Sequence, residues 1–140
     1  MIQHILIATD GSAPARQAAD FAASLAMRYR AKVTVLNAFT PVPAHLGEAD
    51  SSRRLPRTLG EAWDLVANIA KHLREMGIAD VDTDVVEGPA ANVILGAAES
   101  RKADLIVIGA RGLGTWRGLV LGSVSMTVTQ RAESPVLVVK

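Results

Sequence analysis

Short apolar runs alternate with longer segments of helical periodicity along this chain. The runs at 4–9, 32–38, 104–108 and 136–139 are rich in Ile, Leu and Val, and 81–86 alternates polar and apolar residues. Segments in which apolar residues recur every three or four positions separate these runs. Strands that alternate with helices at this pitch predict an α/β fold, because parallel strands need long crossover connections and helices supply them.

The predicted architecture is an open, doubly wound, Rossmann-like sheet of five parallel strands in the order 3-2-1-4-5, with helices on both faces. The helices are expected at 14–30, 59–76, 91–102 and 123–131, and a proline-containing loop at 40–59. A chain of 140 residues fits one domain, so we expect residues 1–140 to form a single unit. The residues expected to face the core are Ala18, Phe21, Ala22, Leu25 and Tyr29 in the first helix, and Leu59, Trp63, Val66, Ala70 and Leu73 in the second.

Composition excludes several classes of function. The chain has 15 Lys and Arg against 14 Asp and Glu, so its net charge of +1 argues against binding to nucleic acid or to a membrane surface. It has no cysteine, which excludes disulfides, thiolate metal sites and a cysteine nucleophile. No apolar run has the length of a membrane span, and the N-terminus lacks the pattern of a signal peptide, so we expect a cytoplasmic protein.

The sequence offers no catalytic machinery. Its three histidines, His4, His45 and His72, lie far apart and lack the spacing of metal ligands, so we expect no metal site built by the protein alone. The Gly-x-Ser-x-Gly pattern of serine hydrolases does not occur. No general base is evident for attack on a phosphate, so no catalytic residue is predicted.

Two strand ends carry residues suited to a ligand. The first strand is followed by Thr9, Asp10, Gly11 and Ser12, and the fourth by the glycine-rich segment 109–125. Ligands of open α/β sheets bind beyond the carboxyl ends of the strands, where the strand order reverses. If the first and fourth strands are neighbours, these two segments face one crevice.

The glycine-rich segment predicts a phosphate site. Glycines let the backbone approach an anion closely, and the segment holds five of the chain's 11 glycines: Gly109, Gly112, Gly114, Gly118 and Gly122. Gly122 then opens a helix whose free N–H groups attract phosphate, and Ser123 and Ser125 can add hydroxyl donors. Neither the dinucleotide pattern GxGxxG nor the Walker lysine is present.

Asp10 has two interpretations. Its carboxylate can accept a hydrogen bond from a ribose hydroxyl or hold Mg²⁺ that bridges phosphates. Alternatively, it caps the helix that follows, for which Ser12 is also predicted as the N-cap.

The long glycine pattern resembles the signature of the universal stress protein family, G-x2-G-x9-G-[ST], which Gly109, Gly112, Gly122 and Ser123 match without a break. The opening Asp10-Gly-Ser, the order of elements and the closing strand before Lys140 also resemble this family. The resemblance implies the ATP-binding subgroup. It also implies a site in which Thr9 and Asp10 contact the adenosine, Ala38 offers backbone groups to the adenine edge, Ile108 flanks the nucleoside, and Gly109, Gly112, Gly122, Ser123, Val124 and Ser125 line the ribose and phosphates.

The function implied by this resemblance is a regulatory module of the stress response. It would bind ATP, AMP or another adenine nucleotide with Mg²⁺, hydrolyse it slowly if at all, and form a homodimer through the C-terminal strand. Two alternatives stay open: an enzyme of related fold that uses adenine nucleotides, and a dimeric interaction protein that binds none.

Overall fold

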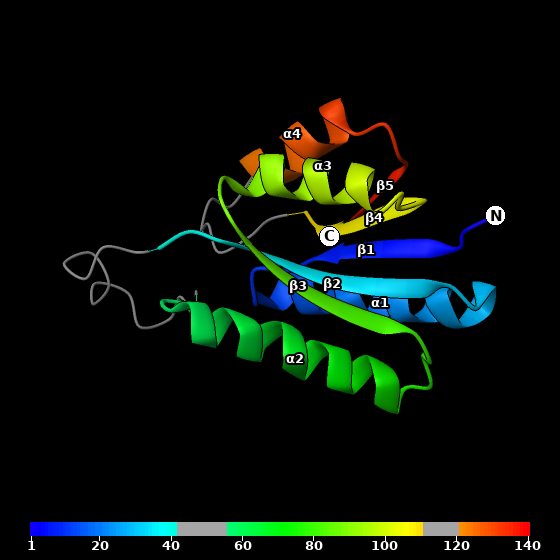
Figure 1. Cartoon of the computed structure of the whole chain (residues 1–140). Coiled ribbons are helices and arrows are strands. Elements are labelled where there is room, and N and C mark those ends of the chain that lie inside the picture. The colour runs from blue at the N-terminus through cyan, green and yellow to red at the C-terminus, as the bar shows by residue number, and fades with distance from the viewer. Residues whose placement is uncertain (42–55, 111–120) are drawn as a thin grey trace.

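The computed structural model describes residues 1–41, 56–110 and 121–140. Within them a five-stranded parallel sheet has the order β3-β2-β1-β4-β5, as predicted (Figure 1). The strands are β1 (His4–Ala8), β2 (Lys32–Phe39), β3 (Val81–Glu87), β4 (Leu105–Gly109) and β5 (Val136–Val139). The helices are α1 (Ala13–Tyr29), α2 (Leu59–Glu75), α3 (Ala90–Ser100) and α4 (Ser123–Arg131).

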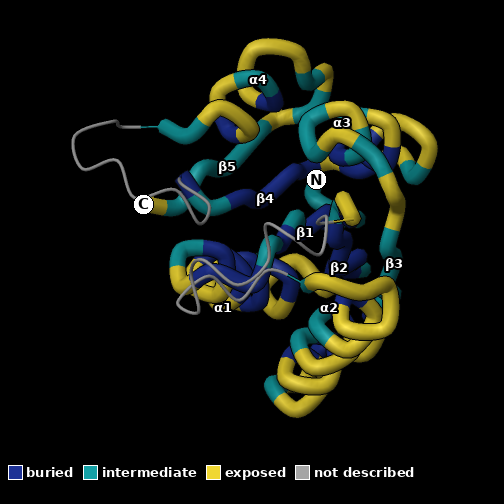
Figure 2. The backbone as a smooth tube through the Cα atoms, turned by 90° about the vertical axis from the view of Figure 1, so that its left-hand side faces the viewer, coloured by how far each residue is buried: buried dark blue, intermediate teal, exposed yellow. Residues whose placement is uncertain are grey.

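Helices cover both faces of the sheet. Figures 1 and 2 show α1 and α2 on one face and α3 and α4 on the other. Successive strand residues point to opposite faces, so each face has its own core. The core toward α1 and α2 includes Ile5, Ile7 and Val35, while Leu6 and Ile106 belong to the core toward α3 and α4.

The buried face of α1 differs from the predicted one. Six alanines form it: Ala15, Ala18, Ala19, Ala22, Ala23 and Ala26. Phe21 and Tyr29, predicted to face the core, are 51% and 45% exposed. Small side chains let the helix lie close to the sheet, and this displaces the larger residues to its flank. In α2 the prediction is confirmed for Val66, Ala70 and Leu73, which are buried. It was wrong for Leu59 and Trp63, which are exposed.

Local signals place the helix ends. Ser12 caps α1, as predicted, by accepting a hydrogen bond from the N–H of Ala15 at 3.3 Å. Thr58 and Glu61 form a capping box at the start of α2. Gly77 follows the C-cap of α2 with φ of +105°, a conformation that favours glycine.

Asp104 joins the beginnings of β1 and β4. Its Oδ2 accepts hydrogen bonds from the N–H groups of Gln3 and His4, each at 2.9 Å. These two bonds stabilise the carboxylate and hold the pKa of Asp104 below its ordinary value of 3.8. The contact fixes the register of the two strands whose far ends form the crevice.

The lowered pKa predicts a pH-dependent contribution to stability. A depressed carboxyl pKa stabilises the fold above the unfolded value of 3.8, and this contribution is lost as the pH falls further through the folded value. We expect Asp104→Asn to lower the melting temperature at neutral pH, and the difference from the parent to shrink below that value. Thermal unfolding followed by circular dichroism across this range measures it. Asp64→Asn, on the exposed surface of α2, is the control, and a pH-independent difference for Asp104→Asn would contradict the assignment.

Candidate functional site

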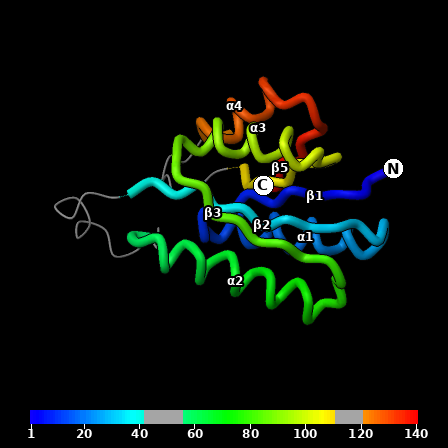
Figure 3. Tube along the Cα trace, in the orientation of Figure 1, coloured from blue at the N-terminus to red at the C-terminus, as the bar shows by residue number. Residues whose placement is uncertain are grey.

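The strand order reverses between β1 and β4, which are hydrogen-bonded neighbours. The helix after β1 covers one face of the sheet and the helix after β4 covers the other (Figure 3). In open α/β sheets such a reversal marks a ligand crevice beyond the carboxyl ends of the two strands, here the end of the sheet that faces the viewer in Figure 2. The turn after β1 and the segment after β4 are expected to meet there only if the two strands are neighbours, and the pairing of β1 with β4 is confirmed.

Thr9 shapes the turn that follows β1. Its N–H donates to the carbonyl of Leu36 at 2.9 Å, and its Oγ1 accepts from the N–H of Gly11 at 3.1 Å. The amide Nδ2 of Asn37 donates to the Thr9 carbonyl at 2.8 Å. Thr9 is also only 5% exposed, so it contributes to the crevice by fixing the backbone around Asp10.

Asp10 supports the turn without capping the helix. Its Oδ1 accepts a hydrogen bond from the N–H of Ser12 at 2.9 Å, and Ser12 itself is the N-cap of α1. The interpretation of Asp10 as the cap is therefore wrong. Its Oδ2 has no hydrogen-bond partner among the described residues, so this half-buried oxygen is available to a hydroxyl or a cation.

Ala38 presents two backbone groups beside the end of β1. Leu36 turns its carbonyl toward β1, and residues two apart in a strand point their backbone groups the same way. Ala38 therefore turns its N–H and C=O toward the line of β1, beyond the point where β1 has ended. Neither group has a partner among the described residues, which leaves one donor and one acceptor side by side.

The N-terminus of α4 is open. Gly122 is its N-cap and supplies no side-chain cap, whereas Ser12 and Thr58 cap α1 and α2. The N–H groups of the first turn, from Ser123, Val124 and Ser125, have no acceptor among the described residues. Free N–H groups and the helix dipole together favour an anion at this position.

Gly122 adopts backbone angles that do not require glycine. Its φ is −72°, a value open to any residue. Its N–H donates to the carbonyl of Ala110 at 2.7 Å, which ties the start of α4 to the end of β4. The side chains of Ser123 and Val124 are exposed beside it.

Ser125 holds this arrangement together. Its hydroxyl contacts the carbonyls of Gly109 and Ala110, each at 2.9 Å, and the residue is 4% exposed. Both contacts are to acceptors, so the single hydroxyl hydrogen is already used. The expected role of its hydroxyl as a donor to phosphate does not fit this geometry, and Ser125 is a positioning residue whose backbone N–H stays free.

The end of β4 lies against the start of α1. A Cβ on Gly109 would lie 3.0 Å from the carbonyl carbon of Pro14 and 3.2 Å from the nitrogen of Ala15, so a side chain there would press on the backbone of α1. Ile108 is 4% exposed and belongs to the core toward α3 and α4, where it underlies the crevice. The remaining predicted site residue, Gly112, lies outside the described residues, as do Gly114 and Gly118 of the same segment.

Asn37 is a site residue that the sequence analysis missed. It is 4% exposed and holds the carbonyl of Thr9, while its Oδ1 is buried without a partner among the described residues. The side chain of Asn37 thus supports the turn after β1 while one of its own buried acceptors stays unpaired, which is costly. A lone polar residue near the end of an apolar strand was the signal that could have revealed it.

For metals and membranes, the structure gives findings on the described residues alone. Residues 1–41, 56–110 and 121–140 contain no group of three His, Asp or Glu placed to hold a metal ion. His4 instead contacts Thr34 Oγ1 at 2.8 Å, and His72 contacts Asp20 at 3.1 Å. No helix within the same ranges is both long and apolar enough to cross a membrane.

Comparison with known proteins gives consistent matches over the full chain. The model of the universal stress protein family matches residues 1–140. A universal stress protein of Thermus aquaticus, encoded in the 3′ region of a QAH/OAS sulfhydrylase gene, is 40% identical over 140 residues and all of both chains. The solved structure of the universal stress protein UspA from Lactobacillus plantarum superposes with a TM-score of 0.84 at 25% identity, covering 99% and 98% of the chains. A universal stress protein solved in complex with cAMP is 28% identical, with a TM-score of 0.74 over 99% and 96% of the chains.

The contacts of Ser125 predict a stability effect. Ser125→Ala leaves the carbonyls of Gly109 and Ala110 without this donor, so we expect a loss of about 1–2 kcal/mol in the free energy of unfolding. Urea denaturation followed by circular dichroism measures the change. Ser123→Ala is the matched control, because that side chain is exposed and has no hydrogen bond among the described residues. Equal denaturation midpoints for the two variants would refute the positioning role.

Proposed function

Because the chain belongs to the universal stress protein family, we propose that its switch-point crevice binds an adenine nucleotide, with ATP as the ligand and Mg²⁺ beside its phosphates. The observation that carries the proposal is the first turn of α4, where three N–H groups lack acceptors and Gly122 leaves the approach open. Phosphate oxygens fit this arrangement, because they accept several hydrogen bonds and carry the charge that the helix dipole favours.

In this proposal, different residues around the crevice contact the adenine, the ribose and the phosphates. The unpaired N–H and C=O of Ala38 complement the adenine edge, which presents the N1 acceptor next to the N6 amine donor. The free Oδ2 of Asp10 accepts a ribose hydroxyl or binds Mg²⁺, since a carboxylate against bare phosphate would be repulsive. Thr9 and Ile108 position the backbone and underlie the base, while Ser123 adds a hydroxyl to the phosphate end. We assign the phosphates also to Gly109, Gly112, Val124 and the N–H of Ser125.

A related protein supports the class of ligand. The universal stress protein solved with cAMP is 28% identical to this chain over nearly its whole length. Adenine and ribose are common to cAMP, AMP and ATP, so this relative supports an adenine nucleotide and leaves the number of phosphates to experiment. Titration with each of the three ligands distinguishes them.

We further propose a regulatory role in the cytoplasm and no catalytic role beyond slow hydrolysis. Among the described residues at the crevice, Asp10 is the titratable side chain, and its Oδ1 is held by the turn. No described side chain there is placed as a base for an attacking water. An adenine-nucleotide enzyme would instead release product at a useful rate, and a protein of the interaction type would not bind nucleotide at all.

The phosphate site is tested by two substitutions in α4. A branched side chain in Gly122→Val occupies the space before the N–H groups, so we expect Mg-ATP binding to be abolished while the fold persists. Ser123→Ala removes one hydrogen bond to a charged group, worth about 1.5–3 kcal/mol, which predicts a loss of roughly tenfold to a hundredfold in affinity. Isothermal titration measures both, with circular dichroism as the control for folding. A folded Gly122→Val protein that binds Mg-ATP like the parent would remove α4 from the site.

We propose that two copies of the chain pair through β5. This edge strand joins β4 on one side, and its outward backbone groups belong to Val136 and Val138, since Pro135 and Val139 bond to β4. A strip of Phe21, Leu25 and Tyr29 runs along α1 at a spacing of four residues, away from the side on which Asp20 contacts α2. Because α1 packs beneath β4 and β5, this strip lies beside the open edge and adds apolar surface to the pairing.

The dimer is tested by removing one outward donor. Val138→Pro eliminates an N–H that points away from β4, so it leaves the internal ladder intact while blocking a sixth strand. We expect this variant to be monomeric by sedimentation velocity, and Val138→Thr, which keeps the N–H, to remain dimeric. A folded Val138→Pro protein that still sediments as a dimer would exclude pairing through β5.

A further inference from the structure

The opposite edge of the sheet is formed by β3, whose outer side is partly open. Its even-numbered residues bond to β2: the N–H of Val33 donates to Asp80 at 2.9 Å, and the N–H of Gly88 donates to Phe39 at 3.0 Å. Odd-numbered residues therefore point their backbone groups outward, because backbone direction alternates along a strand. These outward residues are Val81, Thr83, Val85 and Glu87.

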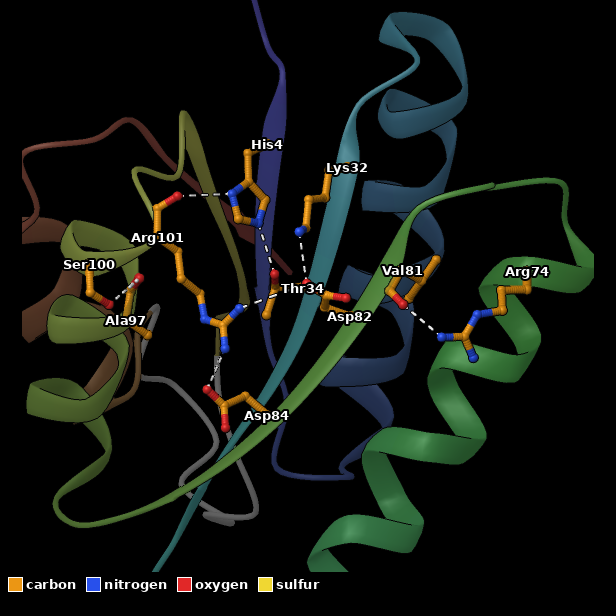
Figure 4. Close-up of polar contacts among 10 residues, drawn as sticks. All are labelled: His4, Lys32, Thr34, Arg74, Val81, Asp82, Asp84, Ala97, Ser100 and Arg101. Atoms are coloured by element: carbon orange, nitrogen blue, oxygen red, sulfur yellow. Dashed lines mark hydrogen bonds and ion pairs between the residues drawn. The ribbon is translucent and has the colours of Figure 1, made fainter.

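One end of this edge is already occupied by a side chain. Arg74, in the last turn of α2, donates from Nη2 to the carbonyl of Val81 at 2.6 Å (Figure 4). The backbone groups of Thr83 and Val85 have no partner among the described residues. Trp63 lies on the same side of α2 as Arg74, about three helical turns earlier, and is 41% exposed. The second half of β3 therefore has unpaired backbone N–H and C=O groups on its outer side, with the exposed indole of Trp63 on one flank.

A groove of about 610 Å³ runs along the other flank, between β3 and α3. Its lining includes Val86, Glu87, Asn92, Val93, Gly96 and Ala97. A Cβ on Gly96 would meet no atom within 4 Å, so the groove is open at this point. At one end of this lining, Arg101 pairs with Asp84 at 2.6 Å (Figure 4). Beyond the lining, Lys32 pairs with Asp82 at 2.8 Å. The groove thus has an apolar centre and a polar end.

The charges along this edge favour a basic partner. Lys32, Arg74 and Arg101 each bond to a residue of β3, so their charges or donors are engaged within the protein. Glu87, at the end of the strand away from Arg74, forms no ion pair with the described residues. An uncompensated carboxylate at this end attracts lysine or arginine.

A second copy of this chain fits the edge less well. Antiparallel self-pairing centred on Thr83 would place Asp82 opposite Asp84, and centring on Asp84 would place two copies of that aspartate opposite each other. Centring on Val85 would place Thr83 opposite Glu87, so that carboxylate would meet no basic side chain. Like charges directly opposite destabilise a strand pair. Asp82 stays ionised, since the hydrogen bond from Lys32 holds its pKa below the ordinary value.

We propose that β3 binds an extended basic segment of a partner protein as an added strand at the outer side of residues 83–87. The backbone of the segment pairs with Thr83 and Val85, alternate apolar side chains enter the groove beside Gly96, and a basic side chain meets Glu87. Backbone pairing gives affinity in this mode of recognition, and the flanking pockets give sequence preference.

The probe for this surface is a fluorescein-labelled peptide of about eight residues in which lysine and valine alternate. We expect its fluorescence polarisation to rise on titration with the full chain. We expect no rise for a peptide in which glutamate replaces lysine, or for one in which proline replaces alternate residues and removes the donors. Failure of the lysine peptide to bind, or equal binding of all three peptides, would overturn the proposal.

Two pairs of variants locate the binding. Thr83→Pro removes an outward N–H without touching the ladder to β2, and Thr83→Val keeps that N–H as its control. Gly96→Leu fills the groove, and Gly96→Ala barely enters it. We expect the first member of each pair to weaken peptide binding by about tenfold or more and its control by far less.

Circular dichroism and Mg-ATP titration verify that all four variants remain folded and keep the separate nucleotide site. Unchanged peptide binding by Thr83→Pro and Gly96→Leu would exclude this edge. If no peptide binds and Thr83→Pro instead reduces self-association in sedimentation velocity, the occupant is a second copy and the proposal is wrong.

Discussion

The close approach of α1 to the end of β4 is the contact on which the crevice depends. The first turn of α1 lies so near Gly109 that a Cβ there would be 3.0 Å from the carbonyl carbon of Pro14. The alanine face of α1 permits this approach along the whole helix, because side chains larger than a methyl group would hold it off the sheet. As a result, the turn after β1 and the end of β4 meet at one place. The hydroxyl of Ser125 then fixes α4 to the end of β4 through the carbonyls of Gly109 and Ala110.

Backbone groups supply most of the binding chemistry that we propose for this place. β2 continues past the end of β1, which leaves the N–H and C=O of Ala38 without a neighbouring strand on that side. α4 begins at a glycine that supplies no cap. Both features arise from the ends of regular elements, where hydrogen bonds stop before the chain does. Side chains such as Thr9, Asn37 and Ser125 then hold these backbone groups in position. Substituting a side chain that only lines the crevice should therefore matter less than disturbing one that holds the backbone.

The sequence predicted the sheet order, the strand bounds to within one residue and the cap of α1 by Ser12, because alternation and capping are local patterns. It failed at the core-facing side of α1, where periodicity favoured Phe21 and Tyr29 over smaller residues. Burial there is decided by the distance between helix and sheet, which no local pattern encodes. The roles of Ser125 and Asn37 were missed for a similar reason, since each bonds to a carbonyl 15 to 28 residues away in the chain.

The two edges of the sheet carry opposite chemistry, and this difference limits what each can pair with. β5 presents Val136 and Val138 outward beside an apolar strip on α1, a surface that a second identical surface can cover. β3 alternates aspartates with valines and a threonine, and Arg74 donates to the carbonyl of Val81. Charged side chains along an edge strand and a blocked first residue are devices that prevent such strands from pairing with their own kind. An edge protected against identical copies but open at Thr83 and Val85 is selective, because it admits a strand whose charges differ from its own.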